Sequence, residues 1–402
     1  MISAKQTTES PSRIEPARLE HAPEAVMDVV AELSAAAATL GDKLHPHTAA
    51  NLAALVRIMN TYYSNLIEGH VTRPRDIERA LAGDLDDEEG RRHLQLEAAA
   101  HVRIQVSIDQ RGRTETLPEP ASCEFIKELH RDFYRNIPKA MLLVKGVTTE
   151  FIMGPGEWRS QPEHDVAVGR HVPPYSNVVA AFMEYFERRY KYESMGTGAR
   201  ILAIPAAHHR LNYIHPFPDG NGRVSRLMSH AMGHWAGIGA HGLWSVSRGL
   251  ARGLDSRQDY KNQMDHADTP RQDDLDGRGN LSQRALEEFT LWFLRVCLDQ
   301  VRFMSGLFDL DTLSRRYRRY VDRSDRLKPE ASYLLTEALM RGEFERGEAP
   351  RITGLPERTA RRVLNDVTDL GLLASATPKG PVSLRFPVEA LETLFPLLYP
   401  ET

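Results

Sequence analysis

Twelve consecutive residues, 215-HPFPDGNGRVSR-226, decide how this sequence is read. The Gly-Asn-Gly triplet permits positive φ angles and a close approach of the backbone to another molecule. If a helix begins there, its first N–H groups point at one spot and attract an anion. Arg223 and Arg226 are three residues apart, so both guanidinium groups lie on one face of that helix. This combination predicts a clamp for a polyphosphate.

Two further side chains of the stretch add chemistry to the clamp. Asp219 is a hard oxygen ligand, suited to a Mg²⁺ ion that is bound jointly with phosphates. His215 ends the preceding helix and can reach the same anion as a general base. Together these groups predict phosphoryl or nucleotidyl transfer to a hydroxyl. The alternative is a capped helix with a solvated aspartate and two surface arginines, but so many constrained positions in one short stretch favour the functional interpretation.

The stretch resembles the signature of the Fic family, HPFx(D/E)GNGRxxR, at every constrained position. The resemblance covers roughly residues 45–265, and only the loop is highly specific. It implies a mainly α fold, with a Fic helical core and a small β-hairpin flap. It also implies an enzyme that uses ATP and Mg²⁺ to transfer AMP to a Ser, Thr or Tyr hydroxyl of a target protein, and of the chain itself.

The resemblance assigns a role to each residue of the loop. His215 would deprotonate the target hydroxyl, and Asp219 would hold Mg²⁺. Phe217 would pack inward and fix the loop. The other residues would bind the phosphates of ATP: the backbone of Gly220 and Gly222 as a cradle, Asn221 and Arg223 at the α- and β-phosphates, and Arg226 at the γ-phosphate.

A second motif, 64-SNLIEG-69, resembles the inhibitory motif of the same family, (S/T)xxxE(G/N), through Ser64, Glu68 and Gly69. Glu68 lies in the last turn of a predicted helix, where the helix dipole disfavours a carboxylate, so a cation is expected nearby. The resemblance implies that this cation is Arg226 and that the pair fills the position of the γ-phosphate. An ordinary solvated glutamate before a helix-ending glycine is the alternative, but the place of the motif upstream of the loop favours inhibition.

Weaker candidates lie outside these two motifs. Residues 154–166 resemble the family's flap, whose edge would pair with a target; Trp158 and Arg159 are the candidate docking residues, and an ordinary surface hairpin is the alternative. Arg252 is a candidate for the adenine side of the nucleotide. His208 and His209 are expected to be core or supporting groups, and no HExxH or other metal-ligand spacing is recognised.

Composition excludes several classes of protein. The chain has 402 residues, a formal net charge of −4 and two cysteines, so a disulfide scaffold, a Cys-rich zinc site and a uniformly basic surface are excluded. No apolar run approaches the length of a membrane helix, and we expect no membrane partner. Residues 1–23 are polar and are expected to form a flexible tail on a cytoplasmic protein. A homodimer is a possible assembly.

Apolar spacing predicts the domain organisation. After the tail, residues 24–120 are expected to form an N-terminal helical region that contains the inhibitory helix at 47–69. Residues 121–308 would be the catalytic core, and 309–328 a basic connecting segment. The individual helices are expected at 47–67, 72–81 with Thr72 as its cap, 122–136, 177–192, 199–214, from the loop to Trp235, and 281–308.

Residues 329–402 read as helix, helix, turn, helix and two short strands, which resembles a winged helix-turn-helix. Arg358, Arg361 and Arg362 would lie on the exposed face of the recognition helix. The segment nevertheless carries eight basic and eleven acidic residues, whereas a DNA-reading module is normally basic. DNA binding therefore remains possible, and a regulatory or protein-contact role is preferred.

The sequence thus predicts an autoinhibited protein adenylyltransferase. Two alternatives stay open. One is a hydrolase that removes AMP from a modified hydroxyl with the same loop and Glu68. The other is a winged-helix transcription regulator whose Fic domain only senses nucleotide, although a pure sensor does not require His215.

Overall fold

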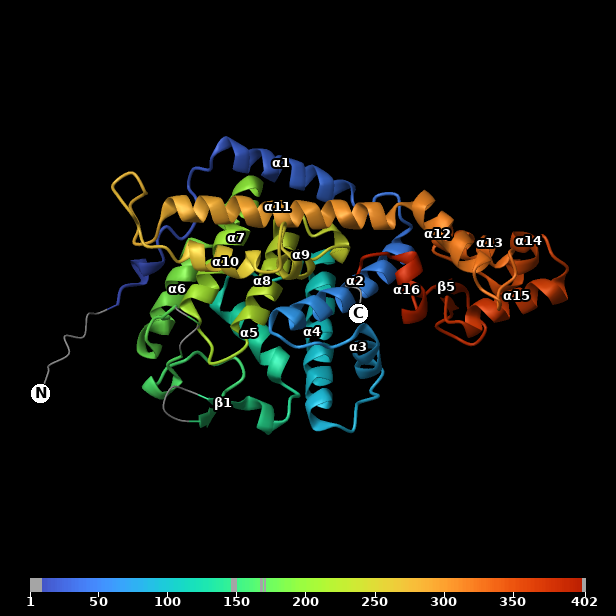
Figure 1. Ribbon diagram of the computed structural model, residues 1–402, viewed down its shortest axis with the longest axis horizontal. Helices are drawn as coiled ribbons and strands as arrows, with labels where there is room; N and C mark the ends of the chain where they lie inside the picture. Colours follow the sequence, from blue (N-terminus) through green and yellow to red (C-terminus); the bar gives the residue numbers. More distant parts are fainter. Residues whose placement is uncertain (1–8, 146–149, 167–168, 170, 400–402) are drawn as a thin grey trace, which may run out of the picture. The chain divides into compact units, whose positions relative to one another are not determined.

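The computed structural model describes residues 9–145, 150–166, 169 and 171–399 and is mainly helical. The chain divides into two compact units (Figure 1). Unit 1 comprises residues 1–37, 60–239 and 245–300, and unit 2 comprises residues 38–59, 240–244 and 301–402. Helices α2 (Pro46–Ile67) and α11 (Gln283–Phe308) each contribute to both units. Among the described residues, no helix has the length and apolar character needed to span a membrane.

Unit 1 is built around two consecutive helices that pack against each other, α7 (Thr197–Ile214) and α8 (Asn221–Trp235). Helices α4 (Glu89–Arg113) and α5 (Cys123–Tyr134) pack on α8, and α6 (Val179–Arg189) packs on α7. The remaining helices of the unit are α1 (Glu24–Thr39), α3 (Pro74–Leu81), α9 (Ser247–Arg252) and α10 (Asp259–Ala267).

Local sequence explains the boundaries of the helices that support the loop. The Ser122 hydroxyl accepts from the N–H of Phe125 and caps α5, whose apolar stripe is then buried against its neighbours. Helix α7 is buried nearly all round, which places it at the centre of the unit. It ends at His215, which adopts the left-handed conformation (φ 52°) and turns the chain sharply into the loop.

A two-stranded antiparallel hairpin is present, but it lies upstream of residues 154–166, where the flap was expected and where none of the described residues forms a strand. Strand β1 (Leu143–Lys145) pairs with β2 (Glu150–Ile152), with Val144 opposite Phe151. The connecting residues 146–149 lie outside the described part of the chain. Residues 154–166 then lead back toward the core and include the short 3₁₀ turn Pro162–His164.

Two expectations about local structure are wrong. Residues 9–23 do not form a loose tail: Ile14 and Ala17 are fully buried, and Glu15 pairs with Arg189 at 2.7 Å. The few apolar residues of this segment are buried within unit 1. The polar composition of the segment as a whole does not reveal this packing. Thr72 does not cap α3, which begins at Pro74; its hydroxyl instead accepts a hydrogen bond from the Asn65 amide at 3.1 Å.

Unit 2 contains the C-terminal helices and a three-stranded sheet. The sheet order is β3 (Glu343–Phe344), β5 (Val382–Leu384), β4 (Leu373–Ala374), and both pairings are antiparallel. The helices are α12 (Leu310–Asp322), α13 (Ala331–Arg341), α14 (Ala349–Thr353), α15 (Glu357–Asp369) and α16 (Val388–Leu394). The basic segment 309–328 is mostly α12, which buries Leu313, Tyr317 and Val321. Three of its arginines, Arg315, Arg318 and Arg319, are exposed, whereas Arg316 is partly buried. The winged-helix assignment of this unit stays a prediction.

Candidate active site

The loop between α7 and α8 is closed by a glycine that no other residue could replace. Gly220 has φ 80°, and a Cβ at this position would lie 2.7 Å from the Tyr134 hydroxyl. Both the left-handed conformation and the missing side chain are therefore required. Helix α8 starts at the next residue, so its free N–H groups open directly onto the loop.

Asn221 holds the loop together from inside. Its side-chain oxygen accepts from the N–H of Phe217 at 2.9 Å, and its amide donates to the Phe217 carbonyl at 2.8 Å. Asn221 is buried, and both of its polar groups are engaged. The predicted contact of Asn221 with a phosphate is therefore not supported by its position; the side chain fixes the shape of the loop instead. Phe217 is fully buried, as expected of the loop's anchor.

Arg159 is buried behind the loop and holds its backbone, so it is not available to dock a target. Only 1% of its surface is exposed. Its Nε donates to the carbonyl of His215 at 2.7 Å, and Nη2 donates to the carbonyl of Ile214 at 3.2 Å. A third bond runs from the Arg159 N–H to the Pro216 carbonyl at 2.8 Å. The prediction of target docking fails for Arg159 because its buried guanidinium is fully engaged inside the protein, with the end of α7, Asp165, Ser176 and the Pro174 carbonyl.

Trp158, the other docking candidate within residues 154–166, is half-buried. Its ring lies 4.7 Å from the ring of Phe217, and the Lys127 ammonium lies 5.0 Å from its centre. Part of this indole thus remains available at the edge of the loop, so a docking role for Trp158 stays a prediction.

His130, on α5, links residues 154–166 to the loop and was not found from the sequence. Its Nδ1 accepts from the N–H of Gly156 at 2.8 Å, which leaves the proton on Nε2 to donate to the Asp219 carbonyl at 3.2 Å. The ring stacks on Phe217 at 3.9 Å between centroids. Burial lowers the pKa of His130 to about 3, so the ring is neutral and this tautomer persists. Its only signal in the sequence is a histidine on the apolar face of a predicted helix.

Asp219 and Arg223 form a charged pair at the mouth of the loop. Arg223 Nη2 lies 3.2 Å from Asp219 Oδ2, and the Tyr134 hydroxyl donates to the same oxygen at 3.2 Å. Burial would raise the pKa of Asp219, but the charge of Arg223 outweighs it and the pKa lies below its usual value. With 54% of its side chain exposed, Asp219 presents an ionised carboxylate to solvent.

Arg223 itself is buried and held from behind by a second carboxylate. Its Nη1 lies 2.9 Å from Glu97 Oε2, on α4. Its guanidinium also lies over the ring of Phe133 at 5.0 Å. Nε of Arg223 is buried and has no hydrogen-bond partner among the described residues, which suits a group that awaits a ligand. Neither Glu97 nor Tyr134 had been identified from the sequence, because their partners are distant along the chain.

Glu68 and Arg226 meet over the start of α8. Arg226 Nη2 lies 2.6 Å from Glu68 Oε1, while Arg226 Nε donates to the Ser64 hydroxyl at 2.9 Å. A Cβ on Gly222 would lie 2.6 Å from the same Glu68 oxygen. The Glu68 carboxylate therefore lies against the first turn of α8, in a position that suits an anion.

The environment of Glu68 keeps it ionised. Burial would raise the pKa of Glu68, but the charges of Arg226 and then Arg223 lower it below its usual value. Gly69 ends the inhibitory helix in the left-handed conformation (φ 83°), and the N–H of His70 donates to the Asn65 carbonyl at 2.9 Å. Of the three residues predicted for the motif, Ser64 and Glu68 thus both bind Arg226, and Gly69 ends the helix that carries them.

His215 ends α7 with its ring partly exposed at the loop. Burial, together with the charges of Arg159 and His171, lowers the pKa of His215 to about 4. The ring is therefore neutral at pH 7 and able to accept a proton.

The remaining residues named from the sequence are Arg252, His208 and His209. Arg252 ends α9 and is exposed, so its contact with a nucleotide stays a prediction. His208 is fully buried between the Ser229 hydroxyl at 2.9 Å and the Tyr260 hydroxyl at 2.8 Å, and His209 is buried beside Asp268 at 3.1 Å. Both histidines are core groups of α7, in agreement with the expectation.

Comparisons with known proteins point to one family. Residues 120–232 match the model of the Fic/DOC family. A stretch of 77 residues is 40% identical to a protein adenylyltransferase Fic of Drosophila erecta and 42% identical to that of Drosophila yakuba. These alignments cover 19% of this chain and 15% of each relative. A crystal structure of a Fic family protein from Desulfovibrio desulfuricans G20 superposes with a TM-score of 0.51 at 18% identity, over 91% of this chain and 98% of that one. The structural likeness extends well beyond the segment that matches in sequence.

Proposed function

We propose that this chain, which contains a Fic/DOC-family domain at residues 120–232, is a protein adenylyltransferase held inactive by its own Glu68. The observation that carries the proposal is the 2.6 Å contact between Glu68 and Arg226 at the start of α8. A carboxylate occupies the place where the loop would receive a phosphate, and the arginine that would bind the phosphate binds the carboxylate instead.

The groups left around this contact suit a nucleoside triphosphate. The N-terminus of α8 offers free N–H groups beside Gly222, and the dipole of a 15-residue helix adds to their attraction for an anion. The buried Nε of Arg223 has no hydrogen-bond partner in the described part of the chain, and Arg226 becomes available when Glu68 leaves. These two guanidinium groups can bind phosphate oxygens in pairs.

His215 is the proposed general base. Its neutral ring can take the proton from a Ser, Thr or Tyr hydroxyl as the hydroxyl oxygen bonds to the α-phosphorus of ATP. The bond from that phosphorus to the bridging oxygen breaks, and pyrophosphate leaves. Arg159 and Asn221 keep the loop in place around this reaction, since both bind its backbone directly.

Asp219 is the proposed ligand of Mg²⁺. Its donor set fits this ion because the carboxylate is ionised and half-exposed, and Tyr134 and Arg223 hold one of its oxygens in place. When bound, Mg²⁺ would neutralise charge on the phosphates.

The test is autolabelling with α-labelled ATP, in which the wild type is compared with Glu68→Gly. Weak labelling by the wild type and strong labelling by the variant are expected. Equal labelling at equal folding would contradict inhibition by Glu68. Faster loss of a preformed AMP label in the wild type would favour the AMP-removing hydrolase, and nucleotide binding without any transfer by either protein would favour a nucleotide sensor.

For unit 2 we propose a regulatory, protein-contacting role rather than DNA binding. The predicted recognition helix is α15, and one of its three arginines, Arg361, already pairs with Glu357 at 2.6 Å. This pairing, together with the excess of acidic over basic residues in the module, weakens the attraction for phosphate backbones. Retention of double-stranded DNA at physiological salt would contradict this part of the proposal.

A further inference from the structure

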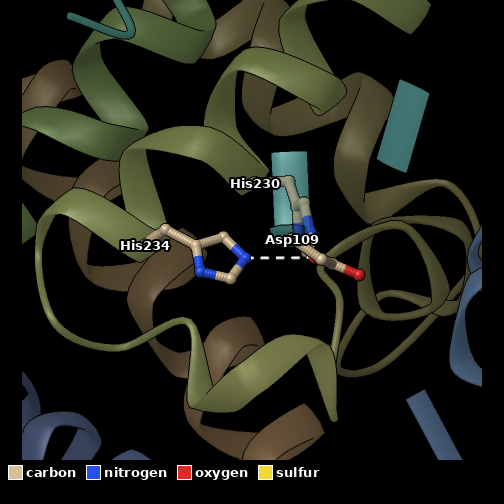
Figure 2. Close-up of side chains that lie close together, drawn as sticks. All are labelled: Asp109, His230 and His234. Carbon is tan, nitrogen blue, oxygen red and sulfur yellow. Dashed lines mark hydrogen bonds and ion pairs between the residues drawn. The ribbon is translucent and has the colours of Figure 1, made fainter. Parts of the chain in front are cut away.

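Three potential ligand side chains meet between α4 and α8, away from the loop (Figure 2). Nε2 of His230 lies 2.7 Å from Oδ1 of Asp109, and Nε2 of His234 lies 3.1 Å from the same oxygen. The ligand atoms of all three lie within 4.8 Å of one another. His230 and His234 are four residues apart on α8 and so project from one face of the helix, while Asp109 comes from α4.

We propose that Asp109, His230 and His234 bind a divalent transition-metal ion, with Zn²⁺ as the expected occupant. Two imidazole nitrogens and one carboxylate oxygen are the donors that Zn²⁺ accepts, and three protein ligands leave a fourth tetrahedral position for water. Donors around such an ion are about 3.3 Å apart when each bond is about 2.0 Å. The observed spacings are shorter by a few tenths of an ångström, so small rotations of the side chains would admit the ion.

The surroundings hold the proposed ligands in place. Asp109 is buried, with 1% of its side chain exposed, and both histidines are nearly buried. A Cβ on Gly112 or on Gly239 would lie 2.7 Å from Nδ1 of His234. Two glycines from different segments therefore close around this ring and make room for it. Because the ring cannot move far, its Nε2 stays directed at Asp109.

Binding requires a defined state of each ring. Without a metal, the two Nε2 atoms can share their protons with the Asp109 oxygen as hydrogen bonds. With a metal, each Nε2 gives its lone pair to the ion and the ring proton resides on Nδ1. The alternative to a metal site is therefore a purely hydrogen-bonded triad, and it predicts no affinity for metal ions.

A metal at this place would join the two helices that support the proposed nucleotide site. Helix α4 supplies Glu97 to Arg223, and α8 carries Arg223 and Arg226. Arg226 and His234 are eight residues apart on α8, about 12 Å along the axis. The ion would thus be a structural brace, separate from the proposed Mg²⁺ ligand Asp219. The proposal does not depend on the reaction that the loop performs.

The test uses the full chain without a tag, freed of metal with a chelator and titrated with Zn²⁺. One bound ion per chain and a higher melting temperature are expected. His234→Gln should weaken binding by more than the about 10–100-fold that loss of an outer partner costs. His266→Gln, which removes an exposed histidine paired with Glu288, is the matched control and should bind as the wild type does.

Co²⁺ supplies a second readout that does not rely on the folding of His234→Gln. The wild type should give the visible absorption of tetrahedral Co²⁺ with nitrogen and oxygen ligands, and His234→Cys should add a thiolate-to-metal band. Failure of the wild type to bind Zn²⁺ and Co²⁺ would overturn the proposal and leave the hydrogen-bonded triad. Unchanged binding in His234→Gln, or an unchanged spectrum in His234→Cys, would overturn it as well.

Discussion

Oε1 of Glu68 and Nη2 of Arg226 are 2.6 Å apart, although 158 residues of chain separate them. The contact joins the end of α2 to the first turns of α8, and Ser64 adds a second bond to the same guanidinium. A carboxylate at a helix C-terminus opposes the helix dipole, so the arginine offsets a cost that the local sequence creates. The same pairing removes the arginine from any phosphate that approaches the loop.

Replacement of Glu68 should therefore release activity. Glu68→Gly is expected to raise autolabelling from α-labelled ATP at least about tenfold, which corresponds to about 1.4 kcal/mol. The affinity for ATP should rise more than that for ADP, because only ATP carries the γ-phosphate that competes with the carboxylate. Glu68→Gln keeps the shape of the side chain and removes its charge, so it separates the steric from the electrostatic contribution of Glu68 to inhibition. Similar gains in affinity for ADP and ATP would argue against competition with the γ-phosphate.

The two residues should also be coupled energetically. Arg226→Ala removes the partner of Glu68, and the two single variants with the double variant form a cycle. Side chains in direct contact show interaction energies of about 0.5–3 kcal/mol, and a value in that range is expected for the free energy of unfolding. Denaturant unfolding of the four proteins gives the measurement. A coupling of zero would mean that the contact contributes nothing to the inactive state.

Much of this site follows from sequence, because its chemistry is concentrated in one short loop and one helix end. Glycines, arginines and a histidine at fixed spacings predict an anion site before any contact is known. The errors arise where a side chain turns inward. Asn221 was predicted to contact a phosphate and Arg159 to contact a target. Both side chains instead form hydrogen bonds with the backbone of the loop.

Residues missed from the sequence share another property. Glu97, His130 and Tyr134 lie on α4 and α5 and reach the loop only through packing of these helices. Their own segments read as ordinary amphipathic helices, so no local pattern distinguishes them. His230 and His234 do carry a local signal, two histidines four residues apart, but a third ligand from α4 makes the site and its sequence position is remote.

Arg159 offers a test of positioning against docking. Arg159→Lys keeps the charge but loses the forked guanidinium, whose separate nitrogens bind the carbonyls of Ile214 and His215, so the end of α7 should shift. A displacement of about 1 Å can cost about 100-fold in rate, and a loss of that order is expected in autolabelling. The melting temperature should fall too, whereas a residue that only docks a target would leave it unchanged. Arg131→Lys, an exposed arginine of α5, is the matched control.

The pKa of the His215 ring is expected to set the pH dependence of AMP transfer. Its pKa is lowered to about 4, so the neutral base is present above that value and is lost as the pH falls through it. An unperturbed histidine would lose half of its base form near pH 6.5. The rate of Glu68→Gly is therefore expected to stay nearly constant from about pH 7.5 down to about pH 5.5. Circular dichroism at each pH controls for unfolding. A midpoint near 6.5 would mean that His215 is more solvated during the reaction than in the free protein.

Removal of the base is the most direct test of the mechanism. In the Glu68→Gly background, His215→Ala is expected to lower autolabelling by about 10²–10⁴-fold, since that is the usual contribution of a general base. The backbone at this position is left-handed, which alanine tolerates less well than histidine, so His215→Asn is the better-matched variant. It keeps a polar side chain and loses the basic nitrogen.

The same variants separate catalysis from binding. The phosphates are expected to contact Arg223, Arg226 and the start of α8, none of which His215 holds in place, so ATP affinity should change little. The melting temperature should also stay close to that of the parent. Labelling at the parental rate by His215→Asn would remove His215 from the role of base. A loss of labelling together with a loss of ATP binding would instead make His215 part of the nucleotide pocket, because a general base acts on the target hydroxyl and leaves ground-state binding of ATP unchanged.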